Sequence, residues 1–484
     1  MNRHVVGIVL LFVLTLPGCS GRKASTGFSE VQNKVATLIG KQIEWDPAAS
    51  PQCVNCSADE VLGQKEISVD DAVQIALRRN PTLQATFEEL GIAEADVREA
   101  GIMKNPVFAG EVRFPDAKGF ITNTHFDLAF SFIDMILAPM RKKVEAMRFD
   151  ATKTRVTFAV LNLAADVRAA YYQVQAQQAK ALVRKDLLIA AEAQSEFAQK
   201  LQKAKNSPEI TSAPKLVLFY QARLEVARDA LELTSLQEKL SRLMGVPAVQ
   251  LKDHIPGALP VLPASDDLGS PDSLEALAVA ERLDLEMQRQ DVTIVDKARS
   301  LRQWWAFTAV EPGATTEHGP ESVRVTGPTL QMELPIFNRG QADRTRLIAQ
   351  LRQSQDKLAA LELSVRSEVR EMLAKMGAAR ATVEEYQTNI GPLRAKIVAL
   401  AQERYNSMTM GATDLLTSRQ EQLTSQIEQL DALRDYWTNR VELERVLGGR
   451  LPAPTKVSDA EGASKADVNV DQQQPKSDRE LRKD

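Results

Sequence analysis

The sequence predicts a mainly α-helical protein with a few β-strands, arranged as an internal tandem repeat. Three observations predict this fold class. Apolar residues at alternating spacings of three and four run through two long stretches, residues 139–205 and 341–406. Each stretch follows two short segments in which apolar and polar residues alternate, as they do in strands. Matching motifs recur in the same order about 200 residues apart.

Composition excludes several classes of function. The chain has 60 Lys and Arg against 64 Asp and Glu, a net charge of −4, so the basic excess of nucleic-acid-binding proteins is missing. Its four histidines (His4, His125, His254 and His318) are far apart in sequence, and it has three cysteines. No cluster resembles a zinc site, and no nucleophile stands beside a base. We therefore expect no enzyme activity, no metal site, no cofactor and no nucleic-acid partner.

Residues 1–18 have the pattern of a secretory signal. A basic start at Arg3 precedes an apolar run over residues 5–16, which is too short for a membrane-spanning helix. The following Pro-Gly-Cys19 resembles a bacterial lipobox, whose cysteine receives acyl chains such as palmitate and becomes the mature N-terminus. Lipidation of Cys19 is the leading interpretation, and an ordinary cleaved signal or an uncleaved anchor are the alternatives. Ser20, in place of an inner-membrane retention Asp, favours the outer membrane.

The repeat divides the mature chain into two units. Residues 68–78 align with 273–282, residues 126–133 with 330–337, and residues 240–245 with 443–448. Units of about 180 residues are much longer than solenoid repeats, so each is an assembly of several elements. The predicted segments are a lipidated N-terminal segment at 19–66, a first repeat at 67–247, a Pro-rich linker at 248–272, a second repeat at 273–453 and a disordered polar tail at 454–484.

Each unit is predicted to hold helices, a strand pair and a helical hairpin. The elements of the first unit are helices ending near Asn80 and Met103, strands at 107–114 and 125–133, a long helix from Pro139 to Lys205 and a return helix at 214–244. Those of the second are a helix at 274–302, strands at 304–310 and 327–334, a long helix at 341–406 and a return helix containing Leu416 and Val441.

Helix length decides how these elements pack. At 1.5 Å per residue, a helix of about 66 residues spans about 100 Å, and its return helix covers only about half of that. We expect the helix before the strands to pack along the remainder, end to end with the return helix. The predicted seams are Val156, Val160, Leu163, Val167, Ala170 and Val174 in the first unit, and Leu358, Leu361, Val365, Val369, Met372 and Met376 in the second.

The second predicted strand has one apolar face that must be covered, because Phe126, Leu128, Phe130 and Phe132 share that face. If that face meets lipid, every sheet edge must be paired, since each unpaired backbone group in a bilayer costs several kcal/mol. Four strands cannot close a barrel, because membrane barrels begin at about eight. We therefore expect oligomerisation, with each protomer donating four strands. The alternative is a helical protein that packs both hairpins on its own core.

Several motifs carry a resemblance to a known family. Residues 72–83, AVQIALRRNPTL, resemble the opening motif ALxxALxxNPxL of the TolC-like outer-membrane efflux proteins, also called outer membrane factors. Residues 327–341, GPTLQMELPIFNRGQ, resemble the family's GxxLxxPLFxxGQ motif, in which a strand passes into a helix. Residues 134–143 and 240–247 resemble two further motifs of the first half. The resemblance covers residues 67–450 and, with the signal, indicates the lipidated branch.

The resemblance implies a homotrimer in the outer membrane of a Gram-negative bacterium, lipid-anchored and extending into the periplasm. Its strands would form one barrel, and its long helices would form a coiled-coil tunnel. Such a protein is a passive exit duct of a tripartite efflux or secretion system, and it works with a periplasmic adaptor (membrane fusion) protein and an inner-membrane pump. The alternative function is a lipid-anchored periplasmic coiled-coil scaffold without a pore.

The resemblance also implies where the tunnel narrows. Residues 405–416 resemble the family's second hairpin turn, and Asp414 is the candidate constriction residue. Carboxylates around a three-fold axis would repel one another and favour cations; alternatively, Asp414 only begins a helix. The candidate adaptor contacts at the hairpin tips are Asn206, Met408, Met410 and Gly411. Compared with the family, Met408 stands where Gly is frequent, Lys205-Asn206 lacks the usual Gly, and Thr417 stands where some members have a second Asp.

Three residue pairs have more than one interpretation. Cys53 and Cys56 are spaced for a local disulfide in an oxidising compartment, and a redox or metal-handling role or two plain thiols are the alternatives. Met408 and Met410 are soft ligands for Cu(I) or only pack at the tip. Trp304 and Trp305 belong to an interfacial aromatic belt or cover a core.

Overall fold

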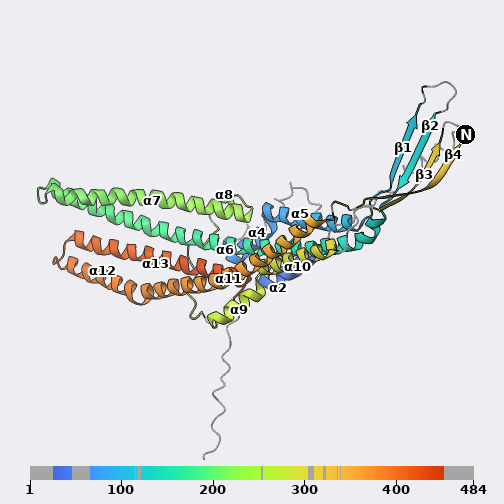
Figure 1. The fold of residues 1–484 in the computed structure, drawn as a ribbon. Coiled ribbons are helices and arrows are strands. Elements are labelled where there is room, and N and C mark those ends of the chain that lie inside the picture. The colour runs from blue at the N-terminus through green and yellow to red at the C-terminus, as the bar shows by residue number, and fades with distance from the viewer. Residues whose placement is uncertain are drawn as a thin grey trace, which may run out of the picture.

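The computed structural model describes residues 26–45, 66–114, 116, 122–251, 254–266, 268–303, 310–319, 323–334, 336–337 and 339–451. These residues form an elongated molecule with a β-sheet at one end and two helical hairpins at the other (Figure 1). The predictions for the signal, the tail, Cys19, the Cys53–Cys56 pair and the two adjacent tryptophans fall outside the described residues.

The same succession of elements occurs twice. The first half holds α4 (Val69–Arg79), α5 (Pro81–Gly101), β1 (Val107–Arg113), β2 (Asn123–Ala129), α6 (Phe132–Lys203) and α7 (Glu209–Met244). The second holds α9 (Pro271–Glu281), α10 (Leu283–Gln303), β3 (Val310–His318), β4 (Arg324–Met332), α11 (Gln341–Glu385), the π-helix η2 (Tyr386–Ile390), α12 (Gly391–Asn406) and α13 (Ala412–Val446). Two helices were not predicted, α2 (Thr26–Ile39) and α8 (Ala248–Leu251).

Capping side chains fix the corner between the first helices. Ser68 accepts a hydrogen bond from the Asp71 amide, and the Asp71 carboxylate accepts one from the Ser68 amide, which completes a capping box at α4. Asn80 ends α4 and caps α5, since its side-chain oxygen accepts from the Leu83 amide at 2.9 Å. Its Nδ2 donates to the Leu243 carbonyl at 2.8 Å, so one residue also attaches this corner to the end of α7.

The predicted seams of the long helices lie in the two cores. Val156, Val160 and Val174 of α6 are fully buried in the first core, and Val365 and Val369 of α11 in the second. α7 packs along one part of α6 and α5 along the other, so two shorter helices follow one long helix end to end (Figure 1). This is the arrangement expected from the helix lengths.

The helix expected at 274–302 is instead two helices, α9 and α10, which separate at Arg282. Arg282 has an extended backbone with ψ 125°, and its guanidinium pairs with Asp284 and with Glu368, each at 2.6 Å. The equivalent break in the first half is signalled by Asn80 and a proline. The break between α9 and α10 is stabilised by ion pairs, and the sequence has no helix-breaking residue there.

Of the strand expected at 304–310, residues 304–309 lie outside the described residues, and Val310 is the first residue of β3 (Val310–His318), which continues beyond the expected end. Pro312 and Gly313 are rare inside strands, so this segment has the sequence of a turn. In the sheet, however, a Cβ on Gly313 would lie 2.6 Å from the Leu128 carbonyl oxygen, so the close approach of the backbones requires glycine. The strand expected at 125–133 ends earlier, at Ala129, because α6 begins at Phe132.

The long helix expected at 341–406 contains the π-helical turn η2. α12 follows it with Pro392 in its first turn. Proline has no amide hydrogen to donate and collides with the carbonyl four residues before it, and a local π-turn relieves that collision.

Asp266, within the Pro-rich linker, attaches the linker to the second repeat. Its carboxylate accepts hydrogen bonds from Arg440 at 2.7 Å, from Arg380 at 2.8 Å and from the Tyr436 hydroxyl at 2.8 Å. The Asp266 side chain is only 7% exposed. Burial, together with the hydrogen bond to Asp266, raises the pKa of Tyr436 to about 12.

The glycine of the recurring motif at 240–245 and 443–448 closes the last turn of each return helix. Gly245 has φ +68°, and a Cβ there would lie 2.5 Å from the Arg79 carbonyl oxygen. Gly448 has φ +95°, and a Cβ there would lie 3.1 Å from the Glu281 carbonyl oxygen. Each glycine therefore allows a return helix to end directly against the end of α4 or α9.

Gly245→Ala is expected to lower the free energy of unfolding by about 2–4 kcal/mol, because a left-handed backbone and a backbone collision both oppose the new methyl group. Chemical denaturation followed by circular dichroism measures it. Gly377→Ala is the matched control, since nothing lies within 4 Å of its Cβ position inside α11. The control is expected to gain about 0.5–1 kcal/mol from helix propensity. Equal effects of the two substitutions would contradict the close contact at Gly245.

Candidate functional site

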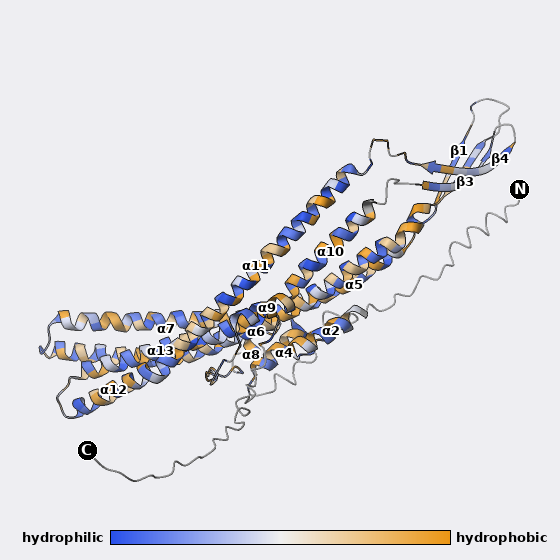
Figure 2. Ribbon diagram, turned by 60° about the horizontal axis from the view of Figure 1, so that its bottom comes forward, coloured by the Kyte–Doolittle hydropathy of each residue, from blue (hydrophilic) through white to orange (hydrophobic). Residues whose placement is uncertain are grey.

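Four helices, α5, α6, α10 and α11, lie next to one another as a wall below the sheet (Figure 2). Each is joined to one strand, since α5 leads into β1, β2 into α6, α10 precedes β3 and β4 precedes α11. The sheet is antiparallel with the order β1-β2-β3-β4, so the helices follow the order of their strands. Sheet and wall are therefore one continuous surface with two faces.

One face of the sheet is apolar and exposed. Its large side chains are Phe108, Phe126, Leu128, Leu330 and Met332. The rings of Phe108 and Phe126 stack with their centroids 5.9 Å apart. On the opposite face, Glu111, His125 and Glu317 are partners across three neighbouring strands. This second face carries charged side chains, although Val107 and Val325 are also exposed on it.

The apolar face continues from the sheet onto α6. Phe132, Ile136 and Met140 are spaced by four residues, so they lie along one side of the helix, and all three are exposed. The surface that would prefer a hydrocarbon environment thus extends about three turns beyond the strands. Across the described residues, no helix combines the length and the apolar character that a bilayer crossing requires.

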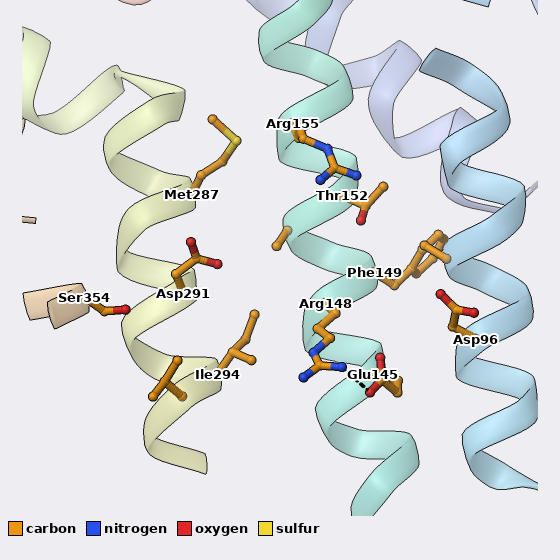
Figure 3. Close-up of a pocket in the computed structure, with 13 residues that line it drawn as sticks. Asp96, Glu145, Arg148, Phe149, Thr152, Arg155, Met287, Asp291, Ile294 and Ser354 are labelled. Carbon is orange, nitrogen blue, oxygen red and sulfur yellow. Dashed lines mark hydrogen bonds and ion pairs between the residues drawn. The ribbon is translucent and has the colours of Figure 1, made fainter. Parts of the chain in front are cut away.

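A cavity of about 620 Å³ opens on the wall between α5, α6 and α10 (Figure 3). Its charged lining side chains include Asp96 of α5, Arg148 and Arg155 of α6, and Asp291 of α10. Arg155 also pairs with Glu89 of α5 at 2.6 Å. The cavity is therefore a polar depression that mixes both signs of charge.

The N-terminal helix α2 covers the other side of this wall. Glu30 of α2 pairs with Lys153 of α6, and Gly27 lies against the Phe149 ring. With the cavity facing the viewer, the ribbon of α2 passes behind α6 (Figure 3). α2 therefore lies mainly on the face of the wall away from the cavity and touches the cavity lining at Phe149.

The turns at the hairpin tips require a left-handed residue. Lys205 has φ +58° and Met408 has φ +56°, and they are the described non-glycine residues with positive φ. Glycine adopts this conformation without strain, which gives a physical reason for the glycines that the family resemblance implies at these turns. The Met408 side chain is 94% exposed, whereas Met410 is half-buried.

Asp414 lies in the first turn of α13, three residues after the N-cap Gly411. It is exposed, and no described ion pair includes it. Its amide donates to the Gly411 carbonyl at 3.2 Å, and the Asp414 carbonyl accepts a hydrogen bond from the Ser418 hydroxyl at 3.0 Å. In one protomer the Asp414 carboxylate therefore lies at the start of a helix and is accessible to other charged groups. Among the described residues, no three His, Cys, Asp or Glu side chains are grouped as a metal site requires.

Polar contacts that sequence reasoning missed join the two hairpins. Gln194 of α6 donates to the Thr413 carbonyl at 3.2 Å and to the Thr417 hydroxyl at 3.0 Å, although Gln194 is almost completely buried. Lys180 lies 3.5 Å from Asp431 further along the same pair of helices. Thr417 therefore has a role between the hairpins. The sequence signals this contact weakly, through a glutamine placed between Ala191 and Ala198, which are also buried.

Farther from the tip, Arg168 of α6 pairs with Glu444 of α13 at 2.9 Å. Burial raises the pKa of Glu444, while Arg168 and Arg440 act in the opposite direction. These contacts are distributed along α6 and α13, so the two hairpins behave as one packed unit in this conformation.

The sequence of the second half matches a known family. A family model described as "Outer membrane efflux protein" matches residues 284–449, from α10 to the end of α13. Over these residues the match confirms the family that the sequence motifs resemble. Among curated proteins, none matches the sequence.

Solved structures share the fold at low sequence identity. A membrane protein from Pseudomonas aeruginosa is 17% identical with a TM-score of 0.66, over 85% of this chain and 96% of that one. The Campylobacter jejuni CmeC outer membrane channel is 15% identical with a TM-score of 0.67, over 92% and 95% of the two chains. The open state of the Neisseria gonorrhoeae MtrE outer membrane channel is 15% identical with a TM-score of 0.63, over 90% and 98%. The predicted class, mainly helical with a small antiparallel sheet, is confirmed.

Proposed function

The second half of this chain belongs to the outer membrane efflux proteins and the whole has the fold of TolC-like channels, and from this premise we propose that it is an outer-membrane exit duct. The duct passively conducts substrates that an inner-membrane pump and a periplasmic adaptor deliver. The observation that carries the proposal is the continuous surface of sheet and wall, apolar on one face and polar on the other. A scaffold without a pore has no use for an exposed apolar sheet.

The proposed duct is a homotrimer. β1 and β4 are the edges of the four-stranded sheet, and each leaves one row of backbone groups unpaired within a protomer. Copies of the chain would pair these edges, bring the apolar faces against lipid and enclose the polar faces. The hairpins would extend into the periplasm, where their tips, at Asn206, Met408, Met410 and Gly411, would contact the adaptor.

We place the protein in the outer membrane of a Gram-negative bacterium, anchored by acyl chains on Cys19. The anchor would act from the outside of the duct, since α2, the first described element after Cys19, covers the face of the wall opposite the cavity. Several acyl chains make a durable attachment, at about 0.8 kcal/mol for each buried methylene group.

Asp414 is the proposed constriction residue. In a trimer its carboxylate, exposed at the start of α13, would form a ring near the tip and favour cations over anions. Asp414→Asn is therefore expected to lower the ratio of K⁺ to Cl⁻ permeability about two-fold or more. Single-channel recording of the detergent-extracted protein in a planar bilayer, under a KCl gradient, measures this ratio. Asp435→Asn, exposed on the same helix but far from the tip, is the control and should leave it unchanged.

The same recordings test the duct itself. Discrete openings of uniform size support a pore. If folded, lipidated protein gives no openings, the duct is excluded and the periplasmic scaffold becomes the better function. If openings are present and both variants keep the wild-type permeability ratio, the duct stands and Asp414 is only a helix-start residue.

A further inference from the structure

A second cavity lies on the wall nearer the sheet, and all four wall helices line it. Its volume is about 560 Å³, within the range of sites for small organic molecules. The lining residues that matter are the arginines Arg141, Arg148 and Arg346 and the apolar Val144, Leu301 and Leu347. Because α5 and α11, the outermost helices of the wall, both reach the same cavity, the wall bends around it.

The arginines of this cavity keep unused donors. Arg141 pairs with Asp134 through Nη1 at 2.9 Å. Arg148, which lines both cavities, pairs with Glu145 through Nη1 at 2.7 Å (Figure 3). Each guanidinium has five N–H groups, so one ion pair leaves most of them available. The Nε of Arg141 is buried and has no hydrogen-bond partner among the described residues. A buried donor without an acceptor favours an incoming anion.

The same cavity offers apolar contact beside this charge. Val144 and Leu347 come from α6 and α11, and Leu301 comes from α10. Three arginines and two carboxylates, Glu145 and Asp343, line the cavity. The third carboxylate, Asp134, pairs with Arg141 from outside the lining and also lies 3.6 Å from Lys104, so part of its charge is directed away from the cavity. A ligand that satisfies both properties has an anionic group and an apolar body.

We propose that this cavity binds amphipathic organic anions, such as aromatic or aliphatic carboxylates and sulfonates, as they pass along the wall. The anionic group pairs with Arg141 and Arg346, and the apolar body lies on Val144, Leu301 and Leu347. The inference rests on the proposed duct, in which the bent face of the wall, opposite α2, encloses the lumen. The inference adds to the proposed function a class of substrate that the wall of the duct itself would bind.

The test uses the full-length, lipidated protein in a planar bilayer, with naphthalene-2-sulfonate as the probe. The anion is expected to cause brief, concentration-dependent interruptions of the open-channel current. Naphthalen-2-yl-trimethylammonium, a cation with the same apolar body, should cause far fewer. Arg346→Gln is expected to raise the apparent dissociation constant for the anion about five- to ten-fold, the loss of one charge-assisted contact.

Two variants on the same helix sharpen the test. Arg344→Gln removes an exposed arginine that is outside the cavity, and it should leave the interruptions unchanged. Asp343→Asn removes the carboxylate that lies 3.3 Å from Arg346, so it should strengthen binding of the anion. Open channels without interruptions, or equal effects of the Arg344 and Arg346 substitutions, would overturn the site and leave the duct intact. If the protein gives no channel openings at all, the proposed duct is wrong, and this result is distinct from the failure of the anion site.

Discussion

Replacing Asp266 by Ala is expected to lower the free energy of unfolding by about 2–4 kcal/mol, because the buried Tyr436 hydroxyl loses its acceptor and two partly exposed arginines lose a shared carboxylate. Arg380 and Arg440 both direct a guanidinium at this carboxylate, and Tyr436, fully buried, donates its hydroxyl to it. Without Asp266, the linker keeps its backbone contacts, in which Arg380 donates to the Pro263 and Ala264 carbonyls and Trp437 to the Pro260 carbonyl. Thermal and urea unfolding of the detergent-extracted protein, followed by circular dichroism, measures the loss.

Asp435→Ala is the control for Asp266. Asp435 also pairs with an arginine, Arg434 at 2.8 Å, but its side chain is 53% exposed. Exposed ion pairs contribute about 0–1 kcal/mol, so this substitution should change stability little. If the two alanine variants unfold at the same temperature, the linker contact at Asp266 does not stabilise the fold.

The parts of the fold that the sequence predicts well are those in which a periodic pattern determines burial. Val160 and Val365 are core residues because a seam spaced by three and four residues has only one way to pack on a neighbouring helix. Gly245 and Gly448 belong to a motif that recurs in the sequence, but their close contacts with the ends of α4 and α9 arise only in the folded chain. Local pattern and three-dimensional structure agree at these positions.

Other parts depend on contacts between distant residues. The break at Arg282 is held by Glu368, which is 86 residues away, and no local signal announces it. The strand at Val310–His318 has turn residues because its neighbours approach too closely for a side chain at Gly313. At the candidate site, Asp414 was found from a motif, whereas the contact of Gln194 with Thr417 spans 223 residues and was missed.

Leu224→Glu combined with Leu231→Glu is expected to abolish the proposed trimer. Ile210, Val217, Leu224 and Leu231 of α7 are spaced by seven residues, as in a coiled-coil seam, yet all four are more than half exposed. The opposite side of α7 already packs on α6. A neighbouring protomer in the proposed duct would cover this stripe, at about 1.5–3 kcal/mol for each leucine buried.

Light scattering coupled to size-exclusion chromatography in detergent measures the number of protomers, and circular dichroism shows whether the hairpin still folds. The double substitution would place six charges in the three interfaces of a trimer. The cost of burying these charges would exceed the stabilisation from the remaining apolar residues, so we expect folded monomers. Arg223→Glu combined with Ala230→Glu is the matched control. These exposed residues directly precede the two leucines and lie about 100° away around the helix. If the control remains trimeric while the leucine variant is monomeric, the stripe is part of the contact between protomers. If the leucine variant is also trimeric, that contact is excluded, and the edges β1 and β4 alone must hold the assembly.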